Sequence, residues 1–370
     1  MALTDFGAVT PAKKKVWSLE IWRQGRDESF WFSNGFVGKS EDMNKPIHRI
    51  TELTKTERGE SCVMQLVAEL TGDGVSGDDE LEGNEESLVN DTQEVKIDQL
   101  RNGVKSKGRM SEQVTVIRFR ALAKQKLTFW LPDKIDEMMH LCAAGRSFTL
   151  KPDGTNRGAS ALTSLAYAAD VTAASTNRIR YAGGATSEAS ITAADTVSWD
   201  YLVEANAYAK RKKLKPIREG GKPYFAVVLS TEQCRDLKKD PDYRAAVQNA
   251  GPRGSKNPLF TGANAIVDGM MIYDHNKVFN TLGKTGGTKW GAGGAVDGAQ
   301  GLLLGAQAMG FASIGKPNWE ESDTRDYKAK QGVAYDQIFG MLKPQFDSPV
   351  SGEGVEDFGV ISLKTAAAQS

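Results

Sequence analysis

Residues 110–145 read MSEQVTVIRFRALAKQKLTFWLPDKIDEMMHLCAAG, and we expect the rest of the chain to be arranged around this segment. Apolar or small residues recur in it at steps of three or four, which places them on one face of a helix. These residues are Met110, Val114, Ile117, Ala121, Leu131, Ile135, Met138 and Cys142. Only Lys124 and Thr128 interrupt that face, so the pattern predicts one amphipathic spine helix along the whole segment.

The ends and the middle of this helix carry their own signals. Ser111 is suited to cap the start, and Gly145 is suited to end the helix in a left-handed conformation. Pro132 lacks the amide that the preceding turn would bond, so it either kinks one rod or begins a second segment. A continuous rod would be about 50 Å long. The alternative is two ordinary core helices joined at Pro132.

Composition narrows the possible functions. A chain of 370 residues that is 40% hydrophobic can bury a substantial core, and its length favours two lobes. The 47 basic residues balance 47 acidic ones, which argues against tight nucleic-acid binding as the main function. Cys62, Cys142 and Cys234 lie among apolar neighbours, so we expect buried thiols in a reducing compartment. The chain starts without a signal-peptide pattern, and no apolar run is long enough to cross a bilayer, so we expect no membrane partner.

The first 45 residues are rich in aromatic side chains without a helical or strand period. The aromatic residues are Phe6, Trp17, Trp22, Phe30, Trp31, Phe32 and Phe36. An irregular segment this aromatic needs a surface to pack on, and we expect that surface to be the spine helix or a neighbouring copy of the chain.

A long hairpin is predicted before the spine helix. Residues 47–55, 60–70 and 92–100 have strand character, and the last two are expected to pair with each other. Between them lies a glycine-rich tip with seven acids and no base, namely Asp73, Asp78, Asp79, Glu80, Glu82, Glu85 and Glu86. A calcium loop starting at Asp78 would need a bidentate Glu where Val89 stands, so we interpret the tip as a solvated or partner-facing loop.

The second half of the chain predicts another lobe. Residues 149–195 are typical of loops with short elements, and residues 196–213 predict a helix with Trp199, Leu202, Val203 and Ala209 on its apolar side. A buried strand at 224–230 ends in Ser230, which is suited to cap a helix that Pro241 interrupts. A tight hairpin is expected around Asp268-Gly269. Residues 301–315 predict a helix, and residues 327–346 and 357–363 predict strands.

The sequence lacks a recognisable catalytic or metal-binding pattern. None of His48, His140 and His275 has metal-ligand spacing with a cysteine or a second histidine. The carboxylate cluster Asp133-Asp136-Glu137 is interpreted as wet surface. The loop at 283–294 contains Gly-Lys-Thr, but Val278 occupies the first glycine position of a phosphate-binding loop. We therefore predict no enzyme activity, cofactor or metal.

Several segments together resemble a known protein family. They are PYFAVVLSTEQCRDLKKDPDYRAAVQNA at 223–250, NPLFTGANAIVDGMMIYDH at 257–275, AQGLLLGAQAMGFASIG at 299–315, DYKAKQGVAYDQIFGMLKPQFDS at 326–348 and DFGVISL at 357–363. In this order they resemble the major capsid proteins of one branch of tailed bacteriophages, a podophage-like branch with the Hong Kong 97-type fold. The acidic hairpin GDGVSGDDELEGNEESL resembles the extended loop of that branch.

The resemblance implies an α+β fold with an N-terminal arm, an extended loop, a peripheral domain and an axial domain. The expected boundaries are 1–45 for the arm, 46–58 for a peripheral-domain strand, 59–107 for the extended-loop hairpin, 108–195 for the peripheral domain with the spine helix and following loops, 196–320 for the axial domain, and 321–370 for peripheral-domain strands and the C-terminal segment.

The function implied by the resemblance is self-assembly, through hexamers and pentamers, into the icosahedral virion shell around a phage double-stranded DNA genome. Its other implied partners are portal, scaffolding and decoration proteins, with weak non-specific contact to the packaged DNA and assembly in the host bacterial cytoplasm. Candidate contacts between subunits are Glu80, Glu82, Glu85, Glu86, Lys210, Arg211, Lys212, Lys213, Trp17, Trp22 and Trp31.

Two alternatives stay open from the sequence. One is an encapsulin-like cellular nanocompartment shell, which would enclose protein cargo instead of DNA. The other is an enzyme that binds a ligand at the glycine-rich loop 283–294.

Overall fold

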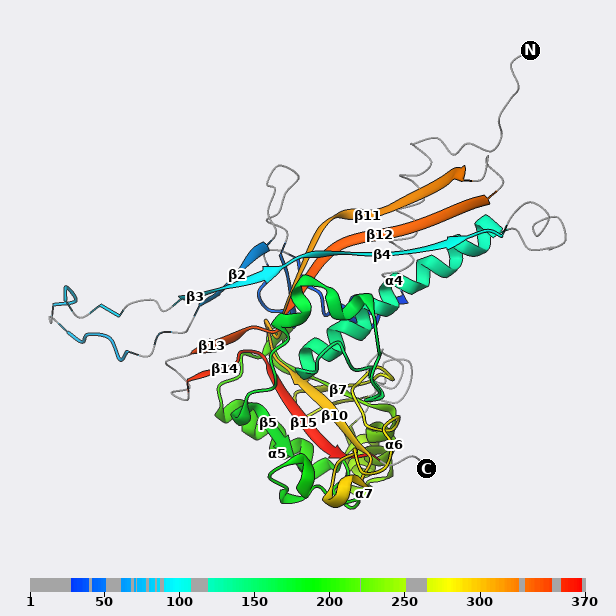
Figure 1. Cartoon of the computed structure of the whole chain (residues 1–370). Coiled ribbons are helices and arrows are strands. Elements are labelled where there is room, and N and C mark those ends of the chain that lie inside the picture. Colours follow the sequence, from blue (N-terminus) through cyan, green and yellow to red (C-terminus); the bar gives the residue numbers. More distant parts are fainter. Residues whose placement is uncertain are drawn as a thin grey trace, which may run out of the picture.

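The computed structural model describes two connected parts with different architectures (Figure 1). The residues that it describes are 28–39, 42–50, 61–67, 70, 72–77, 80–83, 85–86, 90–107, 119–219, 221–250, 265–325, 330–347 and 354–367. One part is a long sheet with the helix α4 beside it, and the other is a lobe built on a second sheet. The predicted α+β class is confirmed.

A four-stranded sheet forms the long part. Its strands, in spatial order, are β1 (Ile47–Ile50), β11 (Met309–Arg325), β12 (Lys330–Leu342) and β4 (Asp98–Lys105). β1 runs parallel to β11, and the other neighbours are antiparallel. In Figure 1 the outer ends of β11, β12 and β4 extend in the same direction as the N-terminal end of α4, well beyond the second lobe.

The spine helix α4 spans Phe119–Ala144 and is continuous through Pro132, so the two-helix alternative is wrong. At about 1.5 Å per residue these 26 residues are about 39 Å long. Gly145 ends the helix with φ of 66°, while Arg146 N donates to Leu141 O and Gly145 N donates to Cys142 O. This pair of hydrogen bonds is a Schellman cap, as the glycine predicted. The expected cap Ser111 lies outside the described residues.

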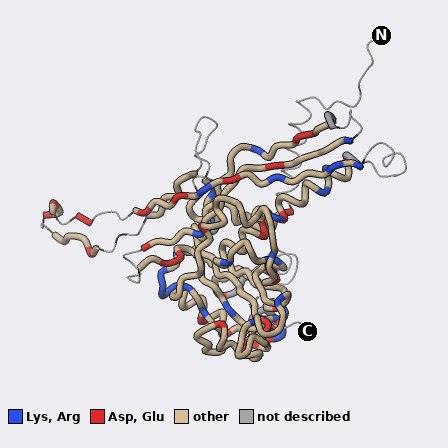
Figure 2. Tube along the Cα trace, in the orientation of Figure 1, with Lys and Arg blue, Asp and Glu red and all other residues tan. Residues whose placement is uncertain are grey.

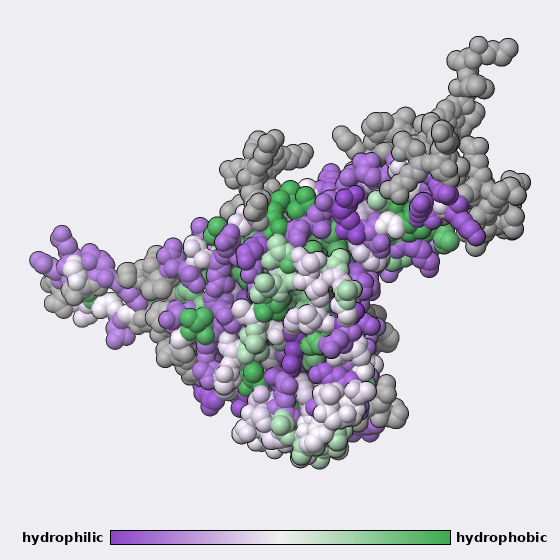
Figure 3. Space-filling model, in the orientation of Figure 1, coloured by the Kyte–Doolittle hydropathy of each residue, from purple (hydrophilic) through white to green (hydrophobic). Residues whose placement is uncertain are grey.

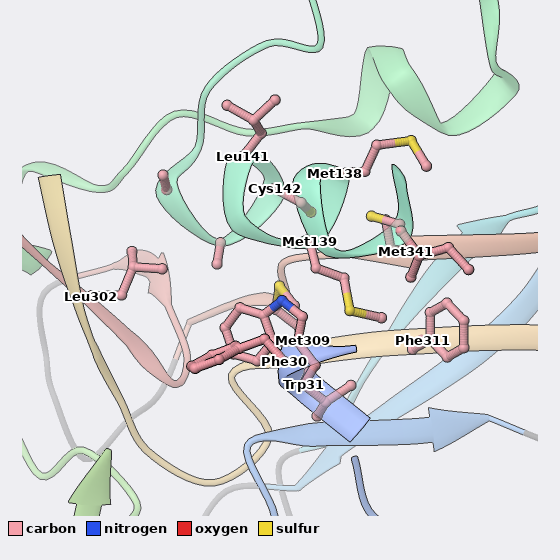
Figure 4. Close-up of a cluster of buried hydrophobic side chains, with 14 of the residues drawn as sticks. Phe30, Trp31, Met138, Met139, Leu141, Cys142, Leu302, Met309, Phe311 and Met341 are labelled. Carbon is pink, nitrogen blue, oxygen red and sulfur yellow. The ribbon is translucent and has the colours of Figure 1, made fainter. Parts of the chain in front are cut away.

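One face of α4 is buried in the main core. Leu131, Ile135, Met138 and Cys142 are fully buried, as their spacing predicted. They belong to the same apolar cluster as Phe311 of β11, Phe339 of β12 and Leu302 of the second lobe. Figure 4 shows Met139 of α4 directed toward Met309 of β11, while Leu141 lies on the opposite side of the helix. The helix therefore joins the two parts through one shared core.

The second lobe is built on a seven-stranded sheet. Its path is β5 (Ile179–Tyr181), β15 (Val360–Ala366), β10 (Gly298–Leu304), β7 (Lys222–Leu229), β9 (Met270–Asp274) and β8 (Ala265–Val267), with β6 (Ile217–Glu219) also paired to β7. The helices α5 (Trp199–Arg211), α6 (Thr231–Lys239) and α7 (Pro241–Ala250) accompany it. Short 3-10 helices lie at Ala161–Ser164, Ala166–Asp170, Thr176–Arg178, Ala182–Gly184, Glu188–Ser190 and Ala292–Gly294.

Several local signals in this lobe are confirmed, and one residue of the predicted apolar face of α5 is an exception. Ser230 and Gln233 form a reciprocal capping box on α6, and Pro241 begins α7. Asp268 and Gly269 both have positive φ, at 50° and 72°, as a tight hairpin turn between β8 and β9 requires. The exception is Val203, which was placed on the apolar face of α5 but is exposed.

The helix predicted over residues 301–315 is wrong. The segment forms β10, a turn, and the start of β11. Every residue of β10 is buried, because the strand lies between β15 and β7 inside the sheet. A strand buried on both faces shows a continuous apolar run instead of an alternating one, and that run is also typical of a buried helix.

The predicted hairpin is confirmed as β2 (Ser61–Val67) and β3 (Asn90–Lys96), with Ser61 opposite Lys96 and Val67 opposite Asn90. The strand expected over 92–100 is divided, because after Ile97 the chain enters β4 in the other sheet. A second small ribbon pairs β13 (Gln345–Asp347) with β14 (Val355–Asp357). All three cysteines are buried. Among the described helices, none has the length and apolar character needed to cross a membrane.

The turn from β3 into β4 crosses β12 at Gly340. A Cβ atom at this position would overlap the carbonyl oxygen of Lys96. The missing side chain therefore allows the hairpin backbone to lie directly on the long sheet. Gly332 lies on the same strand. The atom nearest to a Cβ placed there would be Ser322 O, at 3.9 Å.

We expect Gly340→Ala to lower the free energy of unfolding of the free subunit by about 1–3 kcal/mol, because the backbone of the hairpin must move away from β12. Gly332→Ala is the matched control and should be neutral or slightly stabilising. Urea denaturation followed by circular dichroism measures both. Equal stability of the two variants would contradict the close crossing.

Candidate assembly surfaces

An N-terminal arm segment, residues 28–37, packs against the spine helix. It contains the short helix α2 (Phe30–Ser33), and Phe30, Trp31 and Phe36 are buried. The Trp31 ring lies 4.6 Å from the ring of His140 on α4, measured between centroids. Figure 4 shows Phe30 and Trp31 beside the methionines of α4. The expectation that the N-terminal aromatics pack on the spine helix is confirmed for these residues.

Trp31 is 0% exposed, so its indole packs inside its own subunit and has no surface to offer to another copy. Trp17 and Trp22, the other candidate tryptophans, lie outside the described residues. The arm segment is also tied to β1, because Ile47 N donates to Phe36 O at 3.0 Å and Gly38 N donates to Ile47 O at 2.9 Å.

A buried carboxylate of α4 accepts hydrogen bonds from the arm segment. Asp136 is 3% exposed and accepts hydrogen bonds from Ser29 Oγ at 2.6 Å and Phe30 N at 2.8 Å. Burial raises the pKa of Asp136 to about 6, although these hydrogen bonds and Lys277 act in the opposite direction. The interpretation of Asp133-Asp136-Glu137 as wet surface is therefore wrong for Asp136 and for Glu137, which is buried beside Arg157. Asp136 and His140 lie one helical turn apart and next to the buried face of α4. This spacing is the sequence pattern that could have indicated that the two side chains are buried together.

Two histidines complete the contact between the arm segment and the rest of the chain. The rings of His140 and His275 are stacked, 4.6 Å apart between centroids and 9° from parallel. His140 Nδ1 lies 2.7 Å from Asp136 O and 3.2 Å from Trp31 Nε1. If Nδ1 carries a proton, it donates to the carbonyl oxygen of Asp136; if it does not, it accepts a hydrogen bond from the indole N–H of Trp31. Nδ1 therefore bonds to one of these partners at a time. Phe30 lies over the other histidine, with its centroid 4.5 Å from that of His275.

Buried ion pairs fix the junction near β14, and no sequence pattern indicates them. Lys343 Nζ lies 2.9 Å from Asp357 Oδ2, with 0% and 1% of the two side chains exposed. Asp357 also accepts from Ser175 N at 3.1 Å and Gln345 Nε2 at 3.0 Å. A second pair joins Arg178 Nε to Glu356 Oε2 at 3.0 Å. These charges are paired with each other and hold the 173–178 loop in place, which is a structural arrangement.

The glycine-rich loop 283–294 closes on itself. The amides of Gly287 and Lys289 both donate to Gly294 O, at 2.9 and 3.2 Å, and Trp290 exchanges backbone hydrogen bonds with Val296. Because these amides are used inside the loop, they do not form a cradle of free donors for a phosphate. Within the described part of the chain, no group of three or more His, Cys, Asp or Glu side chains is arranged to hold a metal.

The acidic tip of the β2–β3 hairpin stands away from both lobes, as Figures 1 and 2 show. Its described acids, Asp73, Glu80, Glu82, Glu85 and Glu86, are exposed. Two of them shape the backbone, since Glu86 accepts from Gly72 N at 2.6 Å and Glu85 accepts from Gly83 N at 2.8 Å. Asp78 and Val89, on which the calcium alternative depended, lie outside the described residues.

The basic run at the end of α5 surrounds one tyrosine. Arg180, Arg211 and Lys212 place their charged groups 4.9, 5.1 and 5.8 Å from the centroid of the Tyr208 ring. The Tyr208 hydroxyl donates to Asn177 O at 2.6 Å, which fixes the ring. Lys210 and Lys213 are exposed beside this cluster, so the helix end presents a concentrated positive surface.

Sequence comparison places these features in a family. The model of a family described as phage capsid protein matches residues 2–369 of the chain. The chain is 42% identical over 374 residues to the major capsid protein of Pseudomonas phage KPP25, and the match covers 98% of each protein.

Solved structures share the fold. The capsid of Ralstonia phage GP4 matches with a TM-score of 0.77 and 27% identity, over 92% of both chains. The Cyanophage Pam1 capsid matches with a TM-score of 0.69 and 22% identity, over 100% of both chains, which supports the fold alone. The expected Hong Kong 97-type fold is confirmed. With a family match and a close relative that both extend over nearly the whole length, the chain belongs to the phage capsid protein family.

Proposed function

We propose that many copies of this chain assemble into the closed icosahedral head shell of a bacteriophage, which encloses a double-stranded DNA genome. The observation that carries the proposal is the 42% identity to a phage major capsid protein across 98% of both chains. The balanced charge of the chain is compatible with this role, because a shell must confine DNA without holding it tightly.

The shape of the subunit supports repeated contacts between copies. The acidic tip and the outer ends of α4, β11 and β12 reach beyond the second lobe (Figure 1). Leu122 and Phe129 of α4 are each 40% exposed, and Figure 3 shows apolar patches among hydrophilic ones on this face of the molecule. Several modest contacts of this kind, multiplied by a closed symmetric lattice, give a stable particle while errors can still dissociate.

We assign the parts of the subunit by analogy with the fold. Residues 1–45 form the N-terminal arm, 59–107 the extended loop, and 196–320 the axial domain. Residues 46–58, 108–195 and 321–370 together form the peripheral domain with the C-terminal segment. The separation of the four-stranded and seven-stranded sheets, with the β2–β3 hairpin projecting from the first, supports the division into two domains. The sheets depart from these bounds at three places: β5 and β15 belong to the seven-stranded sheet, and residues 309–320 of β11 belong to the four-stranded one.

The partners that we propose are hexamers and pentamers of the chain itself, with portal, scaffolding and decoration proteins in the complete head. An encapsulin-like nanocompartment would use the same fold. The relative at 42% identity is a phage major capsid protein, and this favours a genome over an enzyme as the cargo.

Between neighbouring subunits, we propose that the acidic tip meets the basic run at the end of α5. The tip is rich in exposed carboxylates, and Lys210, Arg211 and Lys213 are exposed around the Tyr208 cluster. Each exposed ion pair contributes about 0–1 kcal/mol, so the effect depends on several pairs repeated around the shell.

The expected product of assembly is a closed particle tens of nanometres across. We expect the purified chain, with a scaffolding partner where one is required, to form such shells in negative-stain electron microscopy, and particles from infected cells to contain DNA. A chain that stays a monomer or small oligomer under all assembly conditions with its phage partners would contradict the proposal. Protein cargo in place of DNA would favour the nanocompartment.

Charge reversal tests the contact between tip and basic run. We expect Glu80→Lys/Glu82→Lys and, separately, Lys210→Glu/Lys213→Glu to reduce shell yield, because each leaves like charges facing each other. Combining all four changes in one chain should restore much of the yield at low salt. The melting temperature of the free subunit serves as the control and should change little. Normal shell yield from both double variants would show that the two surfaces do not meet. So would a fourfold variant whose yield does not recover.

A further inference from the structure

We infer that the arm segment, residues 28–37, is held on the spine helix by an acid-sensitive latch. The latch consists of Asp136 and His140 of α4 and His275 of the 275–278 loop after β9. Protonation of the two imidazoles releases the arm segment while the two sheets remain folded. The inference concerns the isolated subunit, so it stands or falls independently of shell assembly.

The three side chains lie at the place where the arm segment meets the rest of the chain. Asp136 holds the first residues of the segment through Ser29 Oγ and Phe30 N. His140 lies against Trp31, and His275 lies against Phe30, with centroid separations of 4.6 and 4.5 Å. A change of charge on any of them therefore acts directly on the arm segment.

The imidazoles fit this contact only in their neutral form. His140 is 1% exposed, and its Nε2 is buried without a hydrogen-bond partner among the described residues. A second proton on this ring would create an N–H with no acceptor in an apolar setting, which is costly. The stacked ring of His275 would add a like charge 4.6 Å away.

The charged groups around the two rings do not offset this cost. Lys277 adds a positive charge that opposes protonation of both histidines, and Asp133, the carboxylate beside His275, is paired with that lysine. The Asp136 carboxylate is directed to the arm segment. Burial is the main reason that the pKa of His140 lies well below its usual value and the pKa of His275 is lowered to about 4.

A fall in pH affects docking of the arm segment in opposite directions through the two histidines and through the Asp136 carboxyl. Histidines with lowered pKa values stabilise the docked arm above about pH 6.5, and this stability is lost as the pH falls toward 4. Asp136, with a pKa raised to about 6, favours docking more as the pH falls below that value. Two protons are taken up by imidazoles on release and one is lost by the carboxyl, so acid favours release overall.

Release of the arm segment leaves the main hydrogen-bond networks intact. Within the described part of the chain, its backbone joins a sheet only through the contacts of residues 36–38 with Ile47. The second lobe has its own apolar cluster, with Leu202 of α5, Leu303 of β10 and Leu363 of β15, to which the arm contributes nothing. Local release is therefore separable from unfolding.

The chain has three histidines, so a titration can resolve each of them. We would label the full-length free subunit with ¹³C at histidine Cε1 and record NMR spectra from pH 7.5 to 3.5. Hydrogen exchange of amides 29–37, corrected for intrinsic rates, would be followed in parallel. We expect His140 and His275 to stay neutral well below pH 6.5 and then to protonate together, as amides 29–37 lose protection while β7 and β10 keep theirs.

Variants distinguish the latch from general acid unfolding. His275→Phe keeps an aromatic ring in the stack and should lower the number of protons taken up on release, with a midpoint shifted to lower pH. Asp136→Asn should raise that number from about one to about two, and it should dock the arm more firmly at pH 7, because no buried carboxylate remains. His48→Gln, outside the latch, should leave the midpoint unchanged.

Two outcomes would overturn the inference. One is titration of His140 and His275 near pH 6.5 with no change in the protection of amides 29–37. The other is loss of protection in the arm segment only at the pH at which β7 and β10 also unfold. The wild-type titration decides between these results even if a variant fails to fold.

Discussion

Burial of one face of α4 is the interaction on which the rest of the subunit depends. The same apolar cluster holds Leu131 and Met138 of the helix, Phe339 of the long sheet, Leu302 of the second lobe and Trp31 of the arm segment. Because this cluster joins residues of both sheets and of the arm segment, loss of this face would weaken the contact between them. Each large apolar side chain buried here contributes about 1.5–3 kcal/mol.

The C-terminal end of α4 is fastened by polar groups as well. Gln300 Nε2 donates to Ala144 O at 2.7 Å, and Arg146 Nε donates to Gln300 Oε1 at 2.9 Å. The last turn of the helix is thereby fixed to β10, in the middle of the seven-stranded sheet. Its N-terminal half instead follows the long sheet outward (Figure 1). One end of the helix is thus anchored in the second lobe, and the other lies along the long sheet.

Local patterns predicted much of this fold because they report local physics. The periodicity of α4, the serine before α6 and the turn Asp268-Gly269 each act within a few residues, and each was confirmed. Residues 301–315 were misassigned because an apolar run does not distinguish a buried strand from a buried helix. The partners Ser29 and Asp136 are separated by 107 positions. The aromatic content predicted that the arm packs on the spine helix, but no local pattern indicates which distant polar groups meet there, so the contact of Ser29 with Asp136 could not be derived from the sequence.

The self-closed loop at 283–294 has a practical consequence. Its base is held by the hydrogen bonds between residues 287–289 and Gly294, and Thr285 to Thr288 are exposed. Lengthening a loop whose ends are already fixed costs little free energy, since the closure entropy grows only with the logarithm of length. Foreign peptides could therefore be inserted at this exposed turn, with the sheet that supports the loop unchanged.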